Sequence, residues 1–212
     1  MLRSARIPIL GAVGSALMIG PVAVLAYKVG PTAELNHSIH SRAAWHDAGT
    51  AHSISTFFAH LVDPLPFLAL LAGLVLIGAG FGRIRETIAA VAVVAGATLS
   101  TQVLKVLMPW AWAFPSGHTT AAASLAVALV LVAPPHLRRP AAVLGAAFVA
   151  AVGAAVIVLG WHFPGDVIGG LLVVASWTCA AIAALRLIRP RGPSSPRGRM
   201  RSSSGRFAIS LQ

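Results

Sequence analysis

Two short polar stretches stand out in an otherwise apolar sequence. Residues 114–119 read Phe-Pro-Ser-Gly-His-Thr, and residues 161–166 read Trp-His-Phe-Pro-Gly-Asp. Each stretch lies at the edge of a hydrophobic run, where ionisable side chains are rare and usually functional. Histidine, serine and aspartate are residue types that move protons and bind anions. We therefore expect the two stretches to form one site.

The second stretch has the spacing of an oriented nucleophile. Asp166 follows His162 by four residues, and Pro164 suits the first turn of a helix. The carboxylate can then reach one imidazole nitrogen, which fixes the tautomer and leaves the other nitrogen free to attack. His118 of the first stretch is expected to protonate the leaving oxygen. For a phosphate ester, these roles predict a phosphohistidine that water then hydrolyses.

The first stretch is predicted to bind an anion. A helix beginning here would present backbone N–H groups around Ser116, Gly117 and His118, and helix N-termini attract anions. Gly117 lets a ligand approach the backbone closely. Lys105, near the edge of the preceding run, adds a full positive charge. The predicted anion-binding groups are therefore Lys105, Ser116 and Gly117.

Composition indicates a membrane protein without a cysteine-based metal site. Of the 212 residues, 57% are hydrophobic and 10% charged, whereas soluble domains carry about 25% charged residues. Cys179 is the only cysteine. Among five histidines between residues 37 and 60, only His37 and His40 have same-face helical spacing, so a solvated interfacial segment is favoured over a metal site. No metal or cofactor is expected.

Six apolar runs predict an all-α, polytopic membrane protein with a six-helix bundle. Runs of about 20 apolar residues suffice to span a bilayer. Residues 1–188 are expected to form a single domain, with an external loop at 28–63 that contains amphipathic helical pieces. Residues 189–212 are predicted to be a disordered basic cytoplasmic tail. The predicted spans are 7–26, 64–80, 87–108, 118–133, 141–160 and 167–187.

The distribution of basic residues predicts the orientation. The N-terminus, the 82–86 link, the 134–140 turn and the tail from Arg186 hold 13 of the 16 lysines and arginines. The positive-inside rule makes these segments, and both termini, cytoplasmic in a multi-pass cell membrane protein. Both polar stretches then face the exterior or periplasm. The net charge of +11 is explained by topology and anionic lipid, and no interleaved aromatic residues support nucleic-acid binding.

Pro-Ser-Gly-His at 115–118, followed by His-x-x-x-Asp at 162–166, resembles the PAP2 superfamily of type 2 phosphatidic acid phosphatases. The resemblance covers roughly residues 56–188, and the predicted six spans and their helix order also agree with the family. It implies that His118 is the acid, that His162 is the nucleophile and that Asp166 orients it. It also implies that Lys105, Ser116 and Gly117 bind phosphate. The expected partners are a lipid phosphate substrate and the surrounding membrane lipids.

Two arginines of the family pattern are missing. Trp112 and Val156 stand where the family has phosphate-clamping arginines. A hydrogen bond to a charged group contributes about 1.5–3 kcal/mol. Losing two amounts to about 3–6 kcal/mol, or roughly 10²- to 10⁴-fold in rate. Arg42 or Lys28 of the external loop is expected to supply the missing charge.

The predicted function is metal-independent hydrolysis of a polyprenyl or glycerolipid phosphate, as a phosphomonoester or pyrophosphate, at the external face. Two alternatives arise from the weakened clamp. One is a lipid phosphotransferase or phosphodiesterase, and the other is a catalytically silent lipid-phosphate-binding protein. A serine hydrolase built on Ser116 lacks a Gly-x-Ser-x-Gly elbow. A transporter is disfavoured because no predicted span carries a mid-helix charge or belongs to a pair of broken helices.

Overall fold

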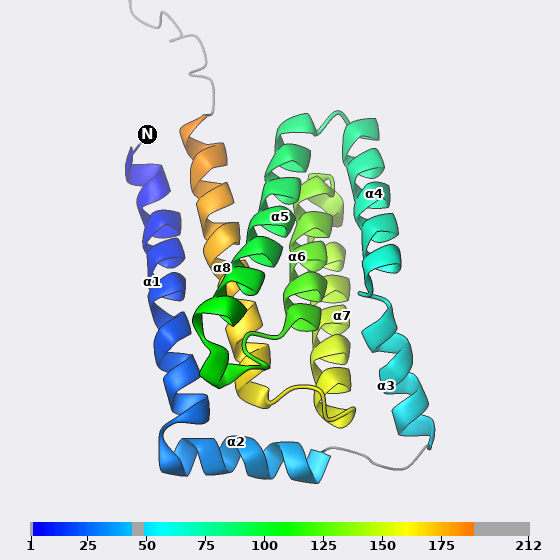
Figure 1. Cartoon of the computed structure of the whole chain (residues 1–212). Helices are drawn as coiled ribbons and strands as arrows, with labels where there is room; N and C mark the ends of the chain where they lie inside the picture. The colour runs from blue at the N-terminus through cyan, green and yellow to red at the C-terminus, as the bar shows by residue number, and fades with distance from the viewer. Residues whose placement is uncertain (1, 44–48, 189–212) are drawn as a thin grey trace, which may run out of the picture.

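The structure is a computed structural model that describes residues 2–43 and 49–188. Its described residues form eight α-helices joined by short connections (Figure 1). The predicted tail at 189–212 lies outside the described residues. The helices are α1 (Leu2–Tyr27), α2 (Gly30–Ala43), α3 (Thr50–His60), α4 (Pro64–Gly80), α5 (Ile84–Leu107), α6 (Gly117–Val132), α7 (Arg138–Val158) and α8 (Pro164–Leu187).

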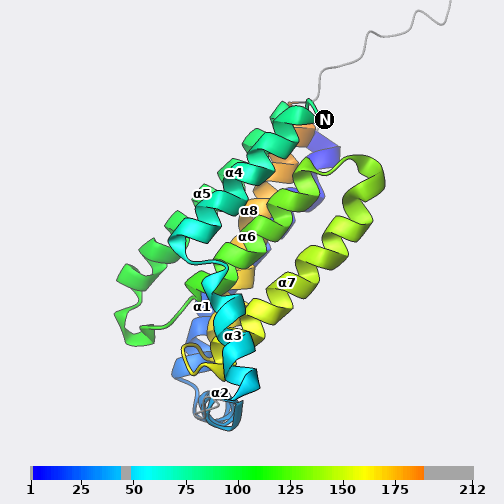
Figure 2. The same ribbon diagram turned by 90° about the vertical axis from the view of Figure 1, so that its right-hand side faces the viewer.

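Most of the helices run side by side in a bundle, and α2 crosses one end of it (Figure 1). Helix α1 packs along α8, and α6 packs against both α5 and α7. Helix α3 packs against α7 and leads into α4 (Figure 2). A cluster of small and branched side chains from α5, α6 and α8 forms part of the core, comprising Val93, Ala97, Ala123, Val173 and Val174.

The predicted all-α, multi-pass membrane architecture is confirmed, but the count of six spans is not. All six predicted apolar runs form helices. Four described helical segments are long and apolar enough to cross a membrane: Ser4–Tyr27, Ile84–Leu107, Pro135–Val158 and Pro164–Leu187. The pair α3 and α4, bent by 56°, makes a fifth if it is counted as one span. Helix α6 has 16 residues, or about 24 Å at 1.5 Å per residue, whereas a hydrocarbon core is about 30 Å thick.

The predicted external loop at 28–63 is largely helical. Helix α2 lies across the end of the bundle, whereas α3 turns along α7 (Figures 1 and 2). Helix α2 contains more polar than apolar residues, which suits a position at the end of the bundle. Helix α2 packs against α7 and α8 and therefore covers the loop between them, which carries the second polar stretch.

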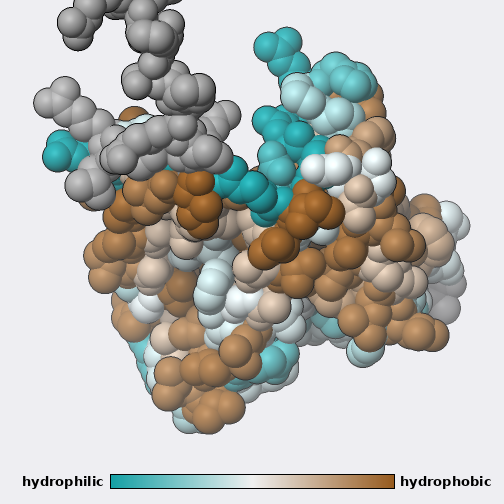
Figure 3. Space-filling view, turned by 90° about the horizontal axis from the view of Figure 1, so that it is seen from above, coloured by the Kyte–Doolittle hydropathy of each residue, from teal (hydrophilic) through white to brown (hydrophobic). Residues whose placement is uncertain are grey.

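Large apolar side chains are exposed along the sides of the bundle. Ile7, Leu65 and Val143 are 79%, 80% and 71% exposed, respectively. In the view from above, hydrophobic residues cover much of the visible face, with hydrophilic residues in patches between them (Figure 3). Such an outer surface suits contact with lipid tails rather than water.

Glycines in α8 let the segment before α6 approach closely. A Cβ atom at Gly169 would collide with the Phe114 ring, and one at Gly170 would press on the Ser116 carbonyl oxygen. Gly165 likewise faces Ala26 of α1 without room for a side chain. These contacts bring the two polar stretches and the end of α1 together, as close small-residue packing does in membrane bundles.

Candidate active site

The 114–117 segment is held to the start of α8 by the backbone. Ser116 donates its backbone N–H to the Asp166 carbonyl oxygen at 2.9 Å. Its buried side chain caps α6, because Ser116 Oγ accepts from the Thr119 backbone N–H at 3.2 Å. The hydroxyl of Thr119 also donates to Ser116 Oγ. The Ser116 side chain is thus occupied in shaping the helix start, and the amides of Gly117 and His118 follow at the first turn.

His162 lies in a tight connection that follows α7. The backbone N–H groups of Trp161 and His162 both donate to the Val156 carbonyl oxygen, at 3.0 and 3.1 Å. The Val156 side chain is completely buried. This position, where the family pattern has an arginine, therefore contributes its backbone to the loop and its side chain to the core.

A chain of hydrogen bonds orients the His162 ring. His162 Nδ1 lies 3.3 Å from Asp166 Oδ2, and the Phe163 backbone N–H donates to the same oxygen at 2.8 Å. The hydroxyl of Tyr27, at the end of α1, donates to Asp166 Oδ1 at 2.6 Å. Asp166 is fully buried, and His162 is 8% exposed. A buried carboxylate with three donors is fixed in direction, so Nδ1 carries the proton and Nε2 is the free nitrogen.

Helix α2 supports the same loop from outside. His40 Nδ1 lies 3.2 Å from the His162 carbonyl oxygen and must donate to it, because a carbonyl can only accept. Asn36 accepts the Gly165 backbone N–H at 2.9 Å. The rings of His37 and His40 pack against Phe163 at centroid distances of 4.6 and 4.4 Å. The histidines that raised the question of a metal site thus contact the loop directly.

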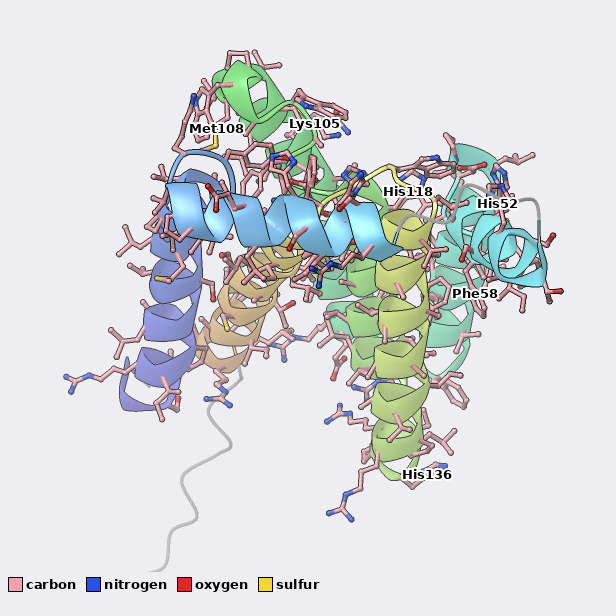
Figure 4. The ribbon with its side chains drawn as sticks, turned by 90° about the horizontal axis from the view of Figure 1, so that it is seen from below. His52, Phe58, Lys105, Met108, His118 and His136 are labelled. Carbon is pink, nitrogen blue, oxygen red and sulfur yellow. The ribbon has the colours of Figure 1, made fainter. Side chains whose placement is uncertain are left out.

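His118 faces His162 across a small gap. The two ring centroids are 6.2 Å apart, and the Trp161 ring lies 5.3 Å from His118. On another side, His118 Nε2 is 4.0 Å from Asp63 Oδ1. Figure 4 shows Lys105 and His118 toward the end of the bundle that α2 crosses, whereas His136 lies away from them.

A cavity of about 490 Å³ opens beside the two histidines. Its polar wall includes Lys105, Gly117, His118 and His162, and α4 adds the apolar side chains of Phe67 and Leu68. Lys105 is the one lysine or arginine among the residues that line it. The cavity therefore combines a cationic, imidazole-lined end with an apolar wall.

The structure brings together most of the predicted site residues. Lys105, Gly117, His118 and His162 line the cavity, and Asp166 and Ser116 lie directly behind it. Arg42 is exposed near the end of α2 and does not line the cavity. Its predicted role in binding stays a prediction.

Three residues at the site were missed by the sequence reasoning. Tyr27 contacts Asp166, Asn36 holds Gly165, and Asp63 lies beside His118. Tyr27 and Asp63 are polar residues at the edges of apolar runs, a signal also shown by the predicted site residues. Among the described residues, no group of three or more His, Cys, Asp or Glu side chains is arranged to hold a metal ion.

Comparisons with known proteins give two matches. A family model described as the PAP2 superfamily matches residues 32–189. A crystal structure of a transmembrane PAP2 type phosphatidylglycerolphosphate phosphatase from Bacillus subtilis is similar, with a TM-score of 0.70 and 22% sequence identity. That match covers 85% of this chain and 98% of the other, and at this identity it establishes a shared fold. No curated protein matches significantly.

Proposed function

Because the chain belongs to the PAP2 superfamily, we propose that it is a membrane phosphatase that hydrolyses a polyprenyl or glycerolipid phosphate through a phosphohistidine. The substrate is a phosphomonoester or a pyrophosphate. The observation that carries the proposal is the placement of His118 and His162, 6.2 Å apart at one cavity, with His162 against the buried Asp166.

In the first step, His162 Nε2 attacks phosphorus. The N–P bond forms as the bond between phosphorus and the lipid oxygen breaks, and His118 gives its proton to that oxygen. Asp166 accepts a hydrogen bond from the Nδ1–H of His162 and stabilises the positive charge that develops on that ring. Tyr27 and the Phe163 amide hold the carboxylate in place during this step.

In the second step, water attacks the phosphohistidine. The neutral His118 accepts a proton from the water as the O–P bond forms, and the N–P bond to His162 breaks. Inorganic phosphate leaves, and both imidazoles return to their starting states. The same two histidines therefore serve both steps. His162 is first the nucleophile and then the leaving group, and His118 is first the acid and then the base.

The phosphate is proposed to be held by Lys105 and by the Gly117 and His118 amides at the start of α6. This clamp is weaker than one containing two arginines, because uncharged residues stand at the two arginine positions of the family. Trp112 is 70% exposed, and Val156 is buried. The chemistry assigned to these groups requires no metal, so we expect activity in the presence of chelator.

The apolar wall of the cavity supports a lipid substrate. Phe67 and Leu68 lie beside the polar end. A lipid phosphate whose phosphate group is bound at Lys105 would therefore place its apolar chain along α4. The positions of the basic turns support the orientation proposed from the sequence. The α4–α5 and α6–α7 turns, which carry arginines, lie at the opposite end from α2 (Figure 1). We propose that the α2 end faces the exterior or periplasm.

The test is phosphate release by the purified protein from a panel of lipid phosphates in chelator. The panel includes polyprenyl phosphate and pyrophosphate, phosphatidic acid and phosphatidylglycerolphosphate, the substrate class named for the similar solved structure. We expect His162→Ala to abolish release and to prevent trapping of radiolabelled phosphate on the protein. If wild type and His162→Ala release equally little from every substrate, the phosphatase proposal is wrong.

The same assay compares the two proposed cations. We expect Lys105→Ala to lower kcat/KM by about 10- to 100-fold, because a contact with a charged group is lost. Arg42→Ala is expected to have a smaller effect, since Arg42 is exposed and lies outside the cavity lining. An equal loss in the two variants would assign Arg42 to the phosphate clamp.

The weak clamp also favours a second candidate, transfer of the phosphoryl group to another lipid. In that case a lipid hydroxyl replaces water in the second step. Wild-type protein that traps phosphate on His162 but releases little of it until an acceptor lipid is added would favour the transferase over the phosphatase.

A further inference from the structure

The corner between α3 and α4 places a second histidine–carboxylate pair at the cavity. His60, the last residue of α3, has its Nδ1 2.6 Å from Asp63 Oδ2. The other oxygen of Asp63 lies 4.0 Å from His118 Nε2. Asp63 directly precedes Pro64 at the start of α4 and lines the cavity. Its carboxylate is therefore hydrogen-bonded to His60 and lies within ion-pair distance of His118.

Trp161 closes this cluster from the side of the His162 loop. Its ring centroid lies 5.3 Å from that of His118 and 6.4 Å from that of His60. The Asp63 side chain keeps 41% of its surface accessible, and His118 keeps 27%. The pair is thus partly shielded, so its electrostatic coupling is stronger than that of a fully solvated pair.

The charges around His118 give Asp63 a distinct role. The ionisable groups that act on His118 come from α3, α5, the α3–α4 corner and the loop before α8; they are His60, Lys105, Asp63 and His162. Three of these four are bases whose positive forms disfavour a proton on His118. Burial of His118 also opposes its protonation, so Asp63, the carboxylate among these groups, is the one influence that favours the imidazolium.

We infer that Asp63 is a positioning residue that favours the protonated form of His118, the acid of the proposed reaction, and that His60 holds Asp63 in place. The inference rests on the proposed function. In the first step, the His118 proton passes to the leaving oxygen as the P–O bond breaks. In the second, His118 takes a proton from the attacking water, and Asp63 again faces an imidazolium.

A comparison of leaving groups separates this role from a structural one. An alkoxide from a lipid phosphate needs a proton as it leaves, whereas p-nitrophenolate is a stable anion that leaves without one. We expect Asp63→Asn to lower kcat/KM about tenfold or more on phosphatidic acid, but less than about threefold on p-nitrophenyl phosphate. His118→Ala should show the same pattern more strongly, and His162→Ala should lose both activities.

The matched control is Glu34→Gln. Glu34 is an exposed carboxylate on α2, so Glu34→Gln changes the charge of this end of the molecule by the same amount as Asp63→Asn. It is expected to leave both activities within about twofold of wild type, as surface charges usually do. Asparagine at position 63 retains the size of aspartate. The Asp63 side chain makes no capping hydrogen bond to α4, so the substitution removes no helix cap.

A second readout does not depend on turnover. Histidine labelled with ¹³C is titrated by NMR in detergent, and the His118 signal is assigned by its loss in His118→Ala. Removing a nearby anion makes protonation harder, so Asp63→Asn should move the His118 midpoint to lower pH by about half a unit or more. The alkaline limb of the pH–rate profile should move in the same direction.

The outcomes distinguish the two proposals. Equal losses on both substrates, or an unchanged His118 midpoint in Asp63→Asn, would overturn the role of Asp63. If wild-type protein hydrolyses neither substrate nor any other lipid phosphate, the proposed function fails. The NMR titration then still decides whether Asp63 and His118 are coupled.

Discussion

Tyr27 extends the hydrogen-bonded chain at His162 to a third side chain. It reaches Asp166 from the end of α1, outside residues 32–189 that match the family model. Asp166 is fully buried, and a buried carboxylate oxygen without a donor is costly. The Tyr27 ring also packs edge-on against Phe163 and Trp110. The Tyr27 hydroxyl therefore binds Asp166, whereas the Tyr27 ring packs against neighbouring aromatic rings, and a substitution can separate the two roles.

Tyr27→Phe is expected to lower kcat about 10- to 100-fold, with little change in KM. The phenylalanine keeps the ring contacts and removes one hydrogen bond to a charged group, worth about 1.5–3 kcal/mol. Steady-state kinetics on the best lipid phosphate measures the change. Thr32→Val is the control, because it removes a hydroxyl bonded to the Leu25 carbonyl at the α1–α2 corner. A comparable loss in Thr32→Val would mean that Tyr27 acts through the fold of this corner.

At the scale of elements, the site depends on close contact between α8 and the segment before α6. Gly169 accepts the Phe114 ring, and Phe114 is completely buried. The backbone bond from Ser116 to Asp166 lies next to this contact. The start of α6 can therefore lie close to His162 because residue 169 of α8 is a glycine, which leaves room for the Phe114 ring.

Gly169→Ala is expected to destabilise the protein by about 1–3 kcal/mol and to reduce activity, because the added Cβ forces Phe114 to move. Thermal unfolding in detergent and phosphate release measure the two effects. Gly73→Ala in α4 is the matched control, since nothing lies within 4 Å of a Cβ placed there. Alanine at position 73 should be neutral or stabilising by up to about 1 kcal/mol. Unchanged stability and activity in Gly169→Ala would contradict the proposed packing role.

At the scale of the whole molecule, the site and the arginine-bearing turns lie at opposite ends of the bundle. Helix α2 covers the end that contains His162, and the turns before α5 and α7 lie at the other end (Figure 1). Such separation is what the positive-inside rule predicts if the arginine-bearing turns are cytoplasmic.

This arrangement predicts which residues are accessible from outside an intact cell. In a Cys179→Ala background, we expect Ser41→Cys on α2 to react with a membrane-impermeant thiol reagent added to spheroplasts. His136→Cys, in the turn before α7, should react only after the membrane is permeabilised. Both positions are exposed in the structure, so access to them depends on the side of the membrane. The reverse pattern would place the active site in the cytoplasm.

Several features of this protein are determined by local sequence. Apolar runs and sparse charge specify membrane helices, because a buried backbone in lipid must satisfy its own hydrogen bonds. The Pro-Ser-Gly-His and His-x-x-x-Asp spacings identify the family, which the match over residues 32–189 confirms. The four-residue spacing of His162 and Asp166 predicts their contact, since it depends only on one helix start.

Other features were decided by the tertiary structure, because they join residues distant in sequence. The Tyr27–Asp166 bond spans 139 positions, and the Asn36–Gly165 bond spans 129. The spacing between such residues carries no periodic signal. Only the packing of α1 and α2 against α8 brings them together. Asp63 likewise reaches His118 only because α3 and α4 meet at a bend beside α6. Long-range contacts of this kind depend on how the helices pack, which the apolar pattern of each helix does not specify.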